Sequence, residues 1–231
     1  MESEKIPPLS QRLLAEFIGT FFLVFAGAGS SVAVSYANPS ISLIVAALAN
    51  GLALALAVSA TMNISGGHIN PAVTIAVLIA RKIKGSNAIM YIISQLLGSI
   101  LASYLLVASM PNSYAKLVNY GAPTLSSQIT VAQGILLEAI MTFLLVFVVF
   151  GTAIDKRGPK IGGFGIGLAV TANALVGGPF TGAAMNPARA LGPEIASMYF
   201  SYWYIYWIGP IIGGIIASLI YGFIMLKNKQ R

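Results

Sequence analysis

The chain has 231 residues, of which 57% are hydrophobic and 8% are charged, and its formal net charge is +7. A soluble domain carries about 25% charged residues, so this composition excludes a soluble globular protein and indicates a membrane protein. Cysteine is absent and His68 is the single histidine, which excludes disulfides and metal centres built from thiolates or histidine clusters; we expect neither a metal nor a cofactor.

Six apolar stretches are long enough to cross a bilayer as helices, because a hydrocarbon core of about 30 Å needs about 20 helical residues. In chain order they cover residues 12–34, 42–63, 87–108, 131–152, 162–179 and 202–226. Two shorter apolar pieces, 71–80 and 187–198, cannot cross the membrane by themselves. The sequence therefore predicts an all-α membrane protein with six transmembrane helices and two short re-entrant pieces.

The positive charge gathers on one side of the predicted membrane and does not form a nucleic-acid-binding patch. If both termini share a side, 11 of the 13 basic residues lie there: Lys5, Arg12, Arg81, Lys82, Lys84, Lys156, Arg157, Lys160, Lys227, Lys229 and Arg231. By the positive-inside rule this side is cytoplasmic. We predict a multi-pass protein of the plasma membrane with cytoplasmic termini and no nucleic-acid partner. On the opposite side, the polar loop 109–130 carries Lys116 and is expected to be exposed.

The two halves of the chain have similar sequences. "EFIGTFFLVF", which starts at Glu16, and "EAIMTFLLVF", which starts at Glu138, are identical at seven of ten positions, and "YIISQLLGSILAS" aligns with "YWIGPIIGGIIAS" 115 residues later. Each half has three spans, and an odd number forces the second half to enter the membrane from the opposite face. We predict one transmembrane domain over 1–231, made of inverted repeats 12–108 and 131–226 joined by loop 109–130.

Glu16 and Glu138 occupy equivalent positions inside apolar spans, where a carboxylate is costly. We expect each carboxylate to accept hydrogen bonds from the re-entrant loop of its own half, whose amides would otherwise lack partners in the membrane. The alternative is a proton-carrying or catalytic pair of carboxylates. No nucleophile or metal ligand lies near either glutamate in sequence, so we do not expect an enzyme.

The triplet Asn-Pro-Ala occurs twice, as Asn70, Pro71 and Ala72 and as Asn186, Pro187 and Ala188. Asparagine is a preferred N-cap and proline suits the first helical turn, so both triplets predict helix starts. A helix over residues 71–80 spans about 15 Å, half the hydrocarbon thickness. We expect the two half-helices to meet at mid-membrane with their positive dipole ends together. Each asparagine oxygen would cap its helix, which leaves two amide donors for a passing molecule.

Several motifs together resemble the aquaporins of the major intrinsic protein family over nearly the whole chain: "AEFIGTF", "SGGHINPAVT", "SQLLGS", "LEAIMTFLLVF", "TGAAMNPARALGP" and "YWIGPIIGG". The resemblance implies an aquaporin-like inverted repeat of six tilted helices and two half-helices around a pore, assembled as a homotetramer in the lipid bilayer. It implies a passive channel for water in single file that excludes protons and ions. Leu23 and Leu145 match the family's apolar lining at the pore centre.

Two further sets of residues are expected to line the pore. Exposed backbone carbonyls would form a ladder of acceptors in the stretches Gly66, Gly67, His68 and Gly182, Ala183, Ala184. We expect the His68 side chain to hold its loop by a hydrogen bond; the alternative is a gate. The family places Arg189 in the narrow outer filter, and counting against its pattern adds Asn50, Ala174 and Ala183.

The filter departs from both common patterns of the family. Strict water channels usually place an aromatic residue and a histidine where this chain has Asn50 and Ala174, and glycerol facilitators usually place an acidic residue where it has Ala190. We expect water conduction together with passage of small neutral solutes such as glycerol, urea or ammonia. The alternatives are a facilitator dedicated to such solutes and an ion-coupled secondary transporter, which also uses inverted repeats and broken helices.

Overall fold

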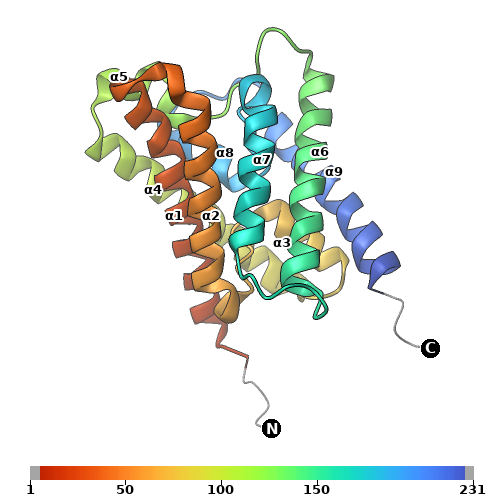
Figure 1. Cartoon of the computed structure of the whole chain (residues 1–231). Helices are drawn as coiled ribbons and strands as arrows, with labels where there is room; N and C mark the ends of the chain where they lie inside the picture. Colours follow the sequence, from red (N-terminus) through yellow and green to blue (C-terminus); the bar gives the residue numbers. More distant parts are fainter. Residues whose placement is uncertain (1–5, 227–231) are drawn as a thin grey trace, which may run out of the picture.

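A computed structural model describes residues 6–226, and its helices confirm the six predicted spans. The long helices are α1 (Leu9–Ala37), α2 (Ser42–Ser65), α4 (Gly85–Ser109), α6 (Val131–Val149), α7 (Phe164–Thr181) and α9 (Ile205–Ala217). The π-helical segments η3 (Phe150–Ile154) and η4 (Ser218–Met225) extend α6 and α9, and the 3-10 turn η1 (Pro39–Ile41) precedes α2. The short helices α3 (Pro71–Ile79) and α8 (Pro187–Ser197) are the two re-entrant pieces (Figure 1).

The order of long and short helices recurs in the two halves, and the halves interlock. Within the first half α1 packs on α2 and α4, and within the second half α6 packs on α7 and α9. Helices α2 and α7 join the halves. Each short helix packs against the last long helix of the opposite half, α3 against α9 and α8 against α4. The two short helices are therefore held between the halves, in the middle of the bundle.

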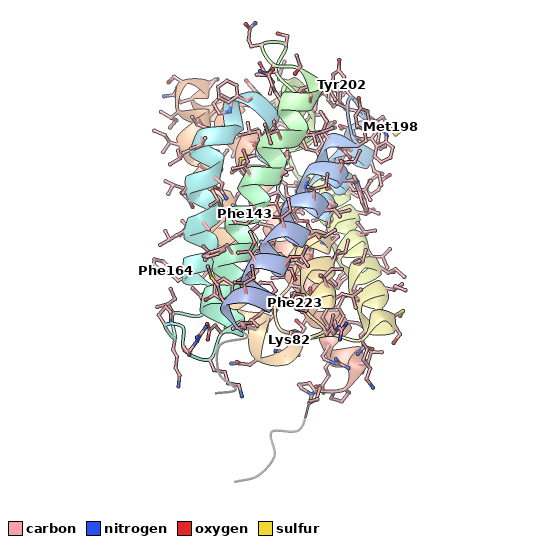
Figure 2. The ribbon with its side chains drawn as sticks, turned by 90° about the vertical axis from the view of Figure 1, so that its right-hand side faces the viewer. Lys82, Phe143, Phe164, Met198, Tyr202 and Phe223 are labelled. Atoms are coloured by element: carbon pink, nitrogen blue, oxygen red, sulfur yellow. The ribbon has the colours of Figure 1, made fainter. Side chains whose placement is uncertain are left out.

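The outer surface of the bundle is apolar, as the side chains projecting from it in Figure 2 illustrate. Large exposed hydrophobic residues recur along the long helices, for example Leu52, Leu56, Leu97, Leu144 and Ile212. A soluble monomer rarely exposes a contiguous apolar surface of this extent. Together with the six spans, this surface identifies a multi-pass membrane protein.

Helices α2 and α7 approach each other closely at Gly51 and Gly167. A Cβ atom on Gly167 would press on the backbone oxygen of Gly51 and on the Cβ of Ala55. Neither of these neighbours is the flexible end of a side chain, so the helices themselves would have to separate. Small residues are therefore required at this crossing, as is usual where membrane helices pack closely.

Replacing Gly167 with alanine is expected to destabilise the protein by about 1–3 kcal/mol, the usual cost of overpacking a close contact. Thermal unfolding of purified protein in detergent measures the change. Gly85→Ala is the matched control, because within residues 6–226 a Cβ at Gly85 has no neighbour within 4 Å. Equal unfolding temperatures for the two variants would contradict the assignment of a tight contact to Gly167.

The loop 109–130 is not simply exposed, and the expectation from its polar sequence is wrong for its middle part. It contains α5 (Asn112–Leu117) and the 3-10 turn η2 (Asn119–Gly121), and Ala115, Tyr120 and Gly121 are buried. Tyr120 packs in one cluster with Val32 of α1, and its hydroxyl donates to Asn112 Oδ1 at 2.8 Å. Gly121 has a φ of +81°, and a Cβ there would meet the Ala28 backbone at 2.7 Å. The aromatic residue thus anchors the loop on α1.

The described chain begins and ends at the same end of the bundle (Figure 1). The α3–α4 connection and the segment between η3 and α7 lie at this end as well, and they carry Arg81, Lys82, Lys84, Lys156, Arg157 and Lys160. Lys5, Lys227, Lys229 and Arg231 lie outside the described residues. Asp155 pairs with Arg157 and also accepts a hydrogen bond from the Tyr221 hydroxyl. The Arg157 guanidinium holds the pKa of Asp155 well below its usual range.

Candidate functional site

The two short helices begin at Asn70 and Asn186, with a proline in the first turn of each. Asn70 Oδ1 accepts the backbone N–H of Ala72 at 2.8 Å, and Asn186 Oδ1 accepts those of Ala188 and Arg189 at 3.0 and 3.2 Å. Both asparagines have the extended backbone of an N-cap residue. Their side-chain oxygens therefore cap the two helix starts.

The asparagine amides also join the two halves of the chain. Asn70 Nδ2 donates to the carbonyl of Met185 at 2.8 Å, and Asn186 Nδ2 donates to the carbonyl of Ile69 at 2.9 Å. Each amide nitrogen has two hydrogens, so one hydrogen on each asparagine is left. The expectation of two available donors per asparagine is wrong, because the opposite loop needs one of them to satisfy a buried carbonyl.

Glu16 binds the first re-entrant loop with both carboxylate oxygens. Oε1 accepts from Ser65 Oγ at 2.6 Å and from the backbone N–H of His68 at 2.9 Å. Oε2 accepts from the backbone N–H of Ile69 at 2.6 Å and from Gln95 Nε2 at 2.7 Å. Neither Ser65 nor Gln95 was predicted from the sequence; the signal available for Gln95 was an amide side chain within the apolar span 87–108.

Glu138 repeats this arrangement in the second half. Its Oε1 accepts from Thr181 Oγ1 at 2.7 Å and from the backbone N–H of Ala184 at 2.9 Å, and its Oε2 accepts from the N–H of Met185 at 2.7 Å. The counterpart of Gln95 is Pro210, which has no donor, so this network is smaller. Both carboxylates accept hydrogen bonds that hold the re-entrant loops, a structural role and not one in proton transfer or catalysis.

The re-entrant loops have an unusual backbone that turns several carbonyls away from other protein groups. Ile69, Ala183 and Met185 have φ values of 55°, 48° and 51°, a region that costs energy for residues other than glycine. Within residues 6–226, no hydrogen bond is donated to the backbone carbonyls of the predicted ladder, Gly66, Gly67, His68, Gly182, Ala183 and Ala184. These oxygens remain available as acceptors.

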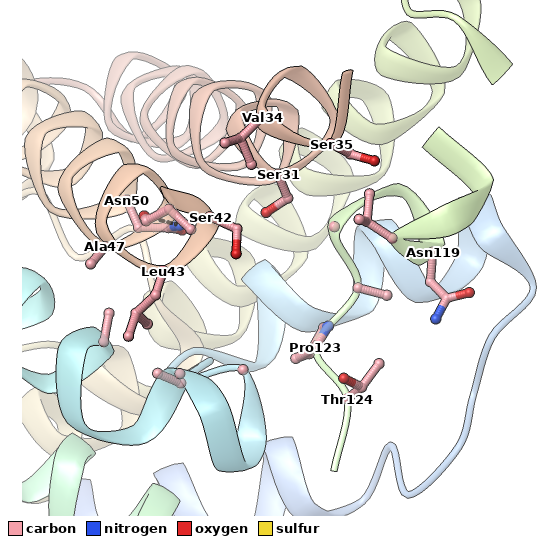
Figure 3. A pocket seen from close by; sticks show the side chains of 18 of the residues that line it. Ser31, Val34, Ser35, Ser42, Leu43, Ala47, Asn50, Asn119, Pro123 and Thr124 are labelled. Carbon is pink, nitrogen blue, oxygen red and sulfur yellow. Dashed lines mark hydrogen bonds between the residues drawn. The ribbon is translucent and has the colours of Figure 1, made fainter. Parts of the chain in front are cut away.

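A cavity of about 560 Å³ opens between α1, α2, α7 and the loop that contains η2. Serines of α1 and α2 line one side, and Pro123 and Thr124 of the loop line another (Figure 3). All four predicted filter residues, Asn50, Ala174, Ala183 and Arg189, line this cavity. We call it the vestibule.

A much narrower cavity of about 20 Å³ follows the vestibule. Its lining includes Leu23, Leu145, Asn70 and Asn186, together with Leu54 and Val170, which were not among the residues predicted from the sequence. A cavity needs about 10–15 Å³ to hold one water molecule, so this cavity, which we call the passage, has room for about one water molecule. Asn50, Ala183 and Arg189 line both cavities and therefore mark the junction between them.

The Arg189 side chain is 6% exposed and is held from two directions at this junction. Nη1 donates to the carbonyl of Gly121 at 3.0 Å, and Nε donates to Asn50 Oδ1 at 3.4 Å. Asn50 is itself oriented by donating from Nδ2 to the Ala46 carbonyl at 2.8 Å. The contribution of Gly121 could not be anticipated, because a backbone carbonyl carries no signature in the sequence.

His68 lies at the first re-entrant loop with its ring in contact with protein groups. Nδ1 is 3.1 Å from Thr74 Oγ1, and the ring packs edge-on against Tyr91 at a centroid distance of 5.2 Å. Thr74 Oγ1 also accepts from Gln95 Nε2 at 2.9 Å. The ring thus takes part in the network that surrounds Glu16.

Comparison with known proteins gives one consistent result. The family model described as "Major intrinsic protein" matches residues 3–221. The chain is 45% identical to "Probable aquaporin TIP3-2" of Arabidopsis thaliana, over 95% of this chain and 85% of the relative, and 46% identical to "Probable aquaporin TIP-type" of Medicago truncatula, over 93% and 87%. Among solved structures, the aquaglyceroporin from Plasmodium falciparum has a TM-score of 0.85 at 22% identity and covers 95% of this chain and 98% of its own, which supports the fold.

Proposed function

The chain belongs to the major intrinsic protein family, and we propose that it conducts water in single file past Arg189 at the junction and then past Asn186 and Asn70, with additional passage of small neutral solutes. It is a passive membrane channel for water and not an enzyme. The observation that carries the proposed path is that both asparagine side chains line the passage of about 20 Å³ that follows the vestibule.

The exclusion of protons follows from the two asparagines. The remaining amide hydrogen of Asn70 and that of Asn186 donate to a water at the centre, which must then point its own hydrogens away from both residues. A chain of water molecules relays a proton only if its hydrogen bonds keep one orientation, and here the orientation reverses. The positive ends of α3 and α8 and the charge of Arg189 repel cations at the same place.

The size of the filter supports passage of solutes larger than water. Ala174 and Ala183 present only methyl groups to the junction, and Asn50 is smaller than the aromatic residue that strict water channels usually carry at that position. The free loop carbonyls accept hydrogen bonds from hydroxyl or amide groups of a solute, while Leu23 and Leu145 offer no polar group. Stopped-flow light scattering on proteoliposomes tests this proposal. Glycerol- or urea-driven reswelling as slow as that of empty vesicles would contradict it.

Replacing Ala174 with histidine is expected to narrow the filter and to lower glycerol and urea flux severalfold more than water flux. Ala174 lines the vestibule at the junction, so a larger side chain takes space that a solute needs and a water molecule does not. Osmotic and solute permeability are measured on the same vesicles. Leu175→His is the control, because Leu175 is 45% exposed on the outside of α7. A parallel fall in both fluxes would argue against a filter at this position.

An ion-coupled transporter is disfavoured by the state of the two buried carboxylates that the repeat duplicates. Glu16 and Glu138 accept four and three hydrogen bonds, so neither is free to bind a coupling ion. A flux that saturates and depends on a proton gradient would reopen that reading.

We also propose the architecture and placement that the sequence predicts. Residues 12–108 and 131–226 form inverted repeats of a single channel domain, an assignment supported by the equivalent networks of Glu16 and Glu138 and by the interlocked short helices. The protein lies in the plasma membrane, with the basic connections and both termini on the cytoplasmic side. Four copies assemble into a homotetramer in which each copy has its own pore. Protease accessibility of tagged termini tests the orientation, and the location of a fluorescent fusion tests the membrane. Light scattering coupled to size-exclusion chromatography tests the number of copies.

A further inference from the structure

Glu194 is a third buried glutamate, and the repeat does not duplicate it: Leu78 stands at the corresponding position of α3. The side chain of Glu194 is 1% exposed. Unlike Glu16 and Glu138, it receives no hydrogen bond on either carboxylate oxygen from any residue between 6 and 226. Burial without donors strongly disfavours a charged carboxylate, so the arrangement seen here suits the neutral acid.

The carboxyl lies on the side of α8 that faces α9. Gly192 faces Ser99 and Ser103 of α4, and Glu194, two residues further along the helix, therefore lies on the opposite side. Ala190, one turn earlier on that side, packs in one cluster with Tyr206 of α9. The Tyr206 hydroxyl is also buried and has no hydrogen-bond partner within residues 6–226. Two unpaired polar groups thus face the same helix interface.

The charged and titratable groups around this interface include the filter arginine. Arg189, on the same helix, interacts electrostatically with Glu194, and Tyr206 interacts with Glu194, Arg189, Glu138 of α6 and Tyr199 of the α8–α9 connection. Helix α4 contributes Ser99, whose hydroxyl donates to the Ala188 carbonyl at 2.5 Å, and Ser103, neither of which titrates. A charge appearing on Glu194 would therefore act on Arg189, whose electrostatic surroundings also include Glu138 and Tyr206.

Arg189 can respond because one of its contacts is weak. The Nε–Asn50 Oδ1 distance of 3.4 Å is long for a hydrogen bond, whereas the Nη1–Gly121 distance of 3.0 Å is ordinary. A negative charge behind α8 offsets the positive charge in the filter and draws the guanidinium away from Asn50. The junction between vestibule and passage then widens.

We propose that Glu194 is a positioning residue that makes the filter respond to pH. When its carboxyl releases its proton to water, the guanidinium of Arg189 moves away from Asn50 and back toward its own helix, and permeability to neutral solutes rises. This inference rests on the proposed role of Arg189 at the junction. It assigns to Glu194 a role in specificity although the residue lines neither cavity.

The test measures glycerol and water permeability of proteoliposomes from about pH 5.5 to about pH 8.5, a range that brackets neutrality. Wild-type solute flux is expected to rise severalfold with pH, and Glu194→Gln is expected to remain at the low-pH value throughout. Glu194→Asp keeps a titratable group and should retain a pH-dependent profile with a displaced midpoint. If the side chain acted only in packing, the pH profiles of Glu194→Gln and Glu194→Asp would not differ in this way.

Asp155→Asn is the matched control. This residue lies at the opposite end of the bundle, and because Arg157 keeps its pKa low it stays ionised throughout the experiment. The control is expected to show the wild-type profile. Glu194→Gln removes no hydrogen bond that residues 6–226 make, so the variant should fold, and thermal unfolding checks this. Glu194→Met is a second variant for which we expect the same pH-independent flux.

Two results would overturn the inference. One is a pH-dependent solute flux that persists in Glu194→Gln. This result overturns the inference even if replacing His68, the alternative titrating group, abolishes the pH dependence. The other is a wild-type channel that conducts water well but whose solute and water fluxes are the same at every pH. Failure of the proposed function would look different, because wild-type water permeability would then equal that of empty vesicles.

Discussion

Replacing Glu16 with alanine is expected to prevent the channel from folding stably. The carboxylate satisfies four donors, of which those on Ser65, Ile69 and Gln95 are buried and that on His68 is partly buried. Each buried donor left without a partner costs about 1–3 kcal/mol, and the total approaches the 5–15 kcal/mol, roughly, by which a typical domain is stable. We expect a loss of about 4 kcal/mol or more, observed as a low yield of monodisperse protein in detergent and a greatly lowered unfolding temperature.

Thr142→Val provides the control for the loss of a buried polar group. The Thr142 hydroxyl lies inside the protein without a hydrogen-bond partner in the described part of the chain. Removing this hydroxyl leaves no donor or acceptor without a partner, so the stability of Thr142→Val should stay close to that of the wild type or increase. Glu16→Gln should fall between the two, because an amide nitrogen cannot accept the bonds that Oε2 now receives. If Glu16→Ala unfolds like Thr142→Val, the loop does not depend on the carboxylate.

Replacing Arg189 with alanine is expected to have the largest effect on selectivity. The guanidinium closes the junction between Asn50 and the Gly121 carbonyl and is the one basic group that lines the described cavities. Two like charges about 4 Å apart repel by about 4 kcal/mol at an effective dielectric constant near 20. Removing the charge should raise cation or proton leak by up to about 1,000-fold and glycerol flux severalfold.

A pH-sensitive dye inside proteoliposomes reports the proton leak, and light scattering reports glycerol and water flux. Arg157→Ala is the matched control, since it removes one positive charge at the end of the bundle remote from the vestibule. We expect that variant to conduct like the wild type. An Arg189→Ala channel that remained tight to protons and no more permeable to glycerol would show that the barrier lies elsewhere, at the asparagines.

The predictions from sequence succeeded where the signal is local. Span length follows from the thickness of the bilayer, so six apolar stretches identified six helices. The Asn-Pro pairs predicted helix starts because capping involves only the next few residues. Loop 109–130 was misjudged for the complementary reason: Tyr120 is buried against Val32, almost ninety residues earlier, and no pattern inside the loop reports that contact.

What the sequence determined by itself is the set of parts: the spans, the duplicated order, the two short helices and the buried carboxylates. A lipid environment requires every backbone polar group to find a partner inside the protein, so helical spans and buried acceptors leave a signal in the sequence. Only the tertiary structure decided how the parts meet. It uses one amide hydrogen of each asparagine to bind the opposite loop, brings the Gly121 carbonyl to Arg189 and, within residues 6–226, leaves Glu194 without a hydrogen-bond donor. These contacts join residues far apart in the chain, and their geometry depends on how whole helices pack, which no short stretch of sequence specifies.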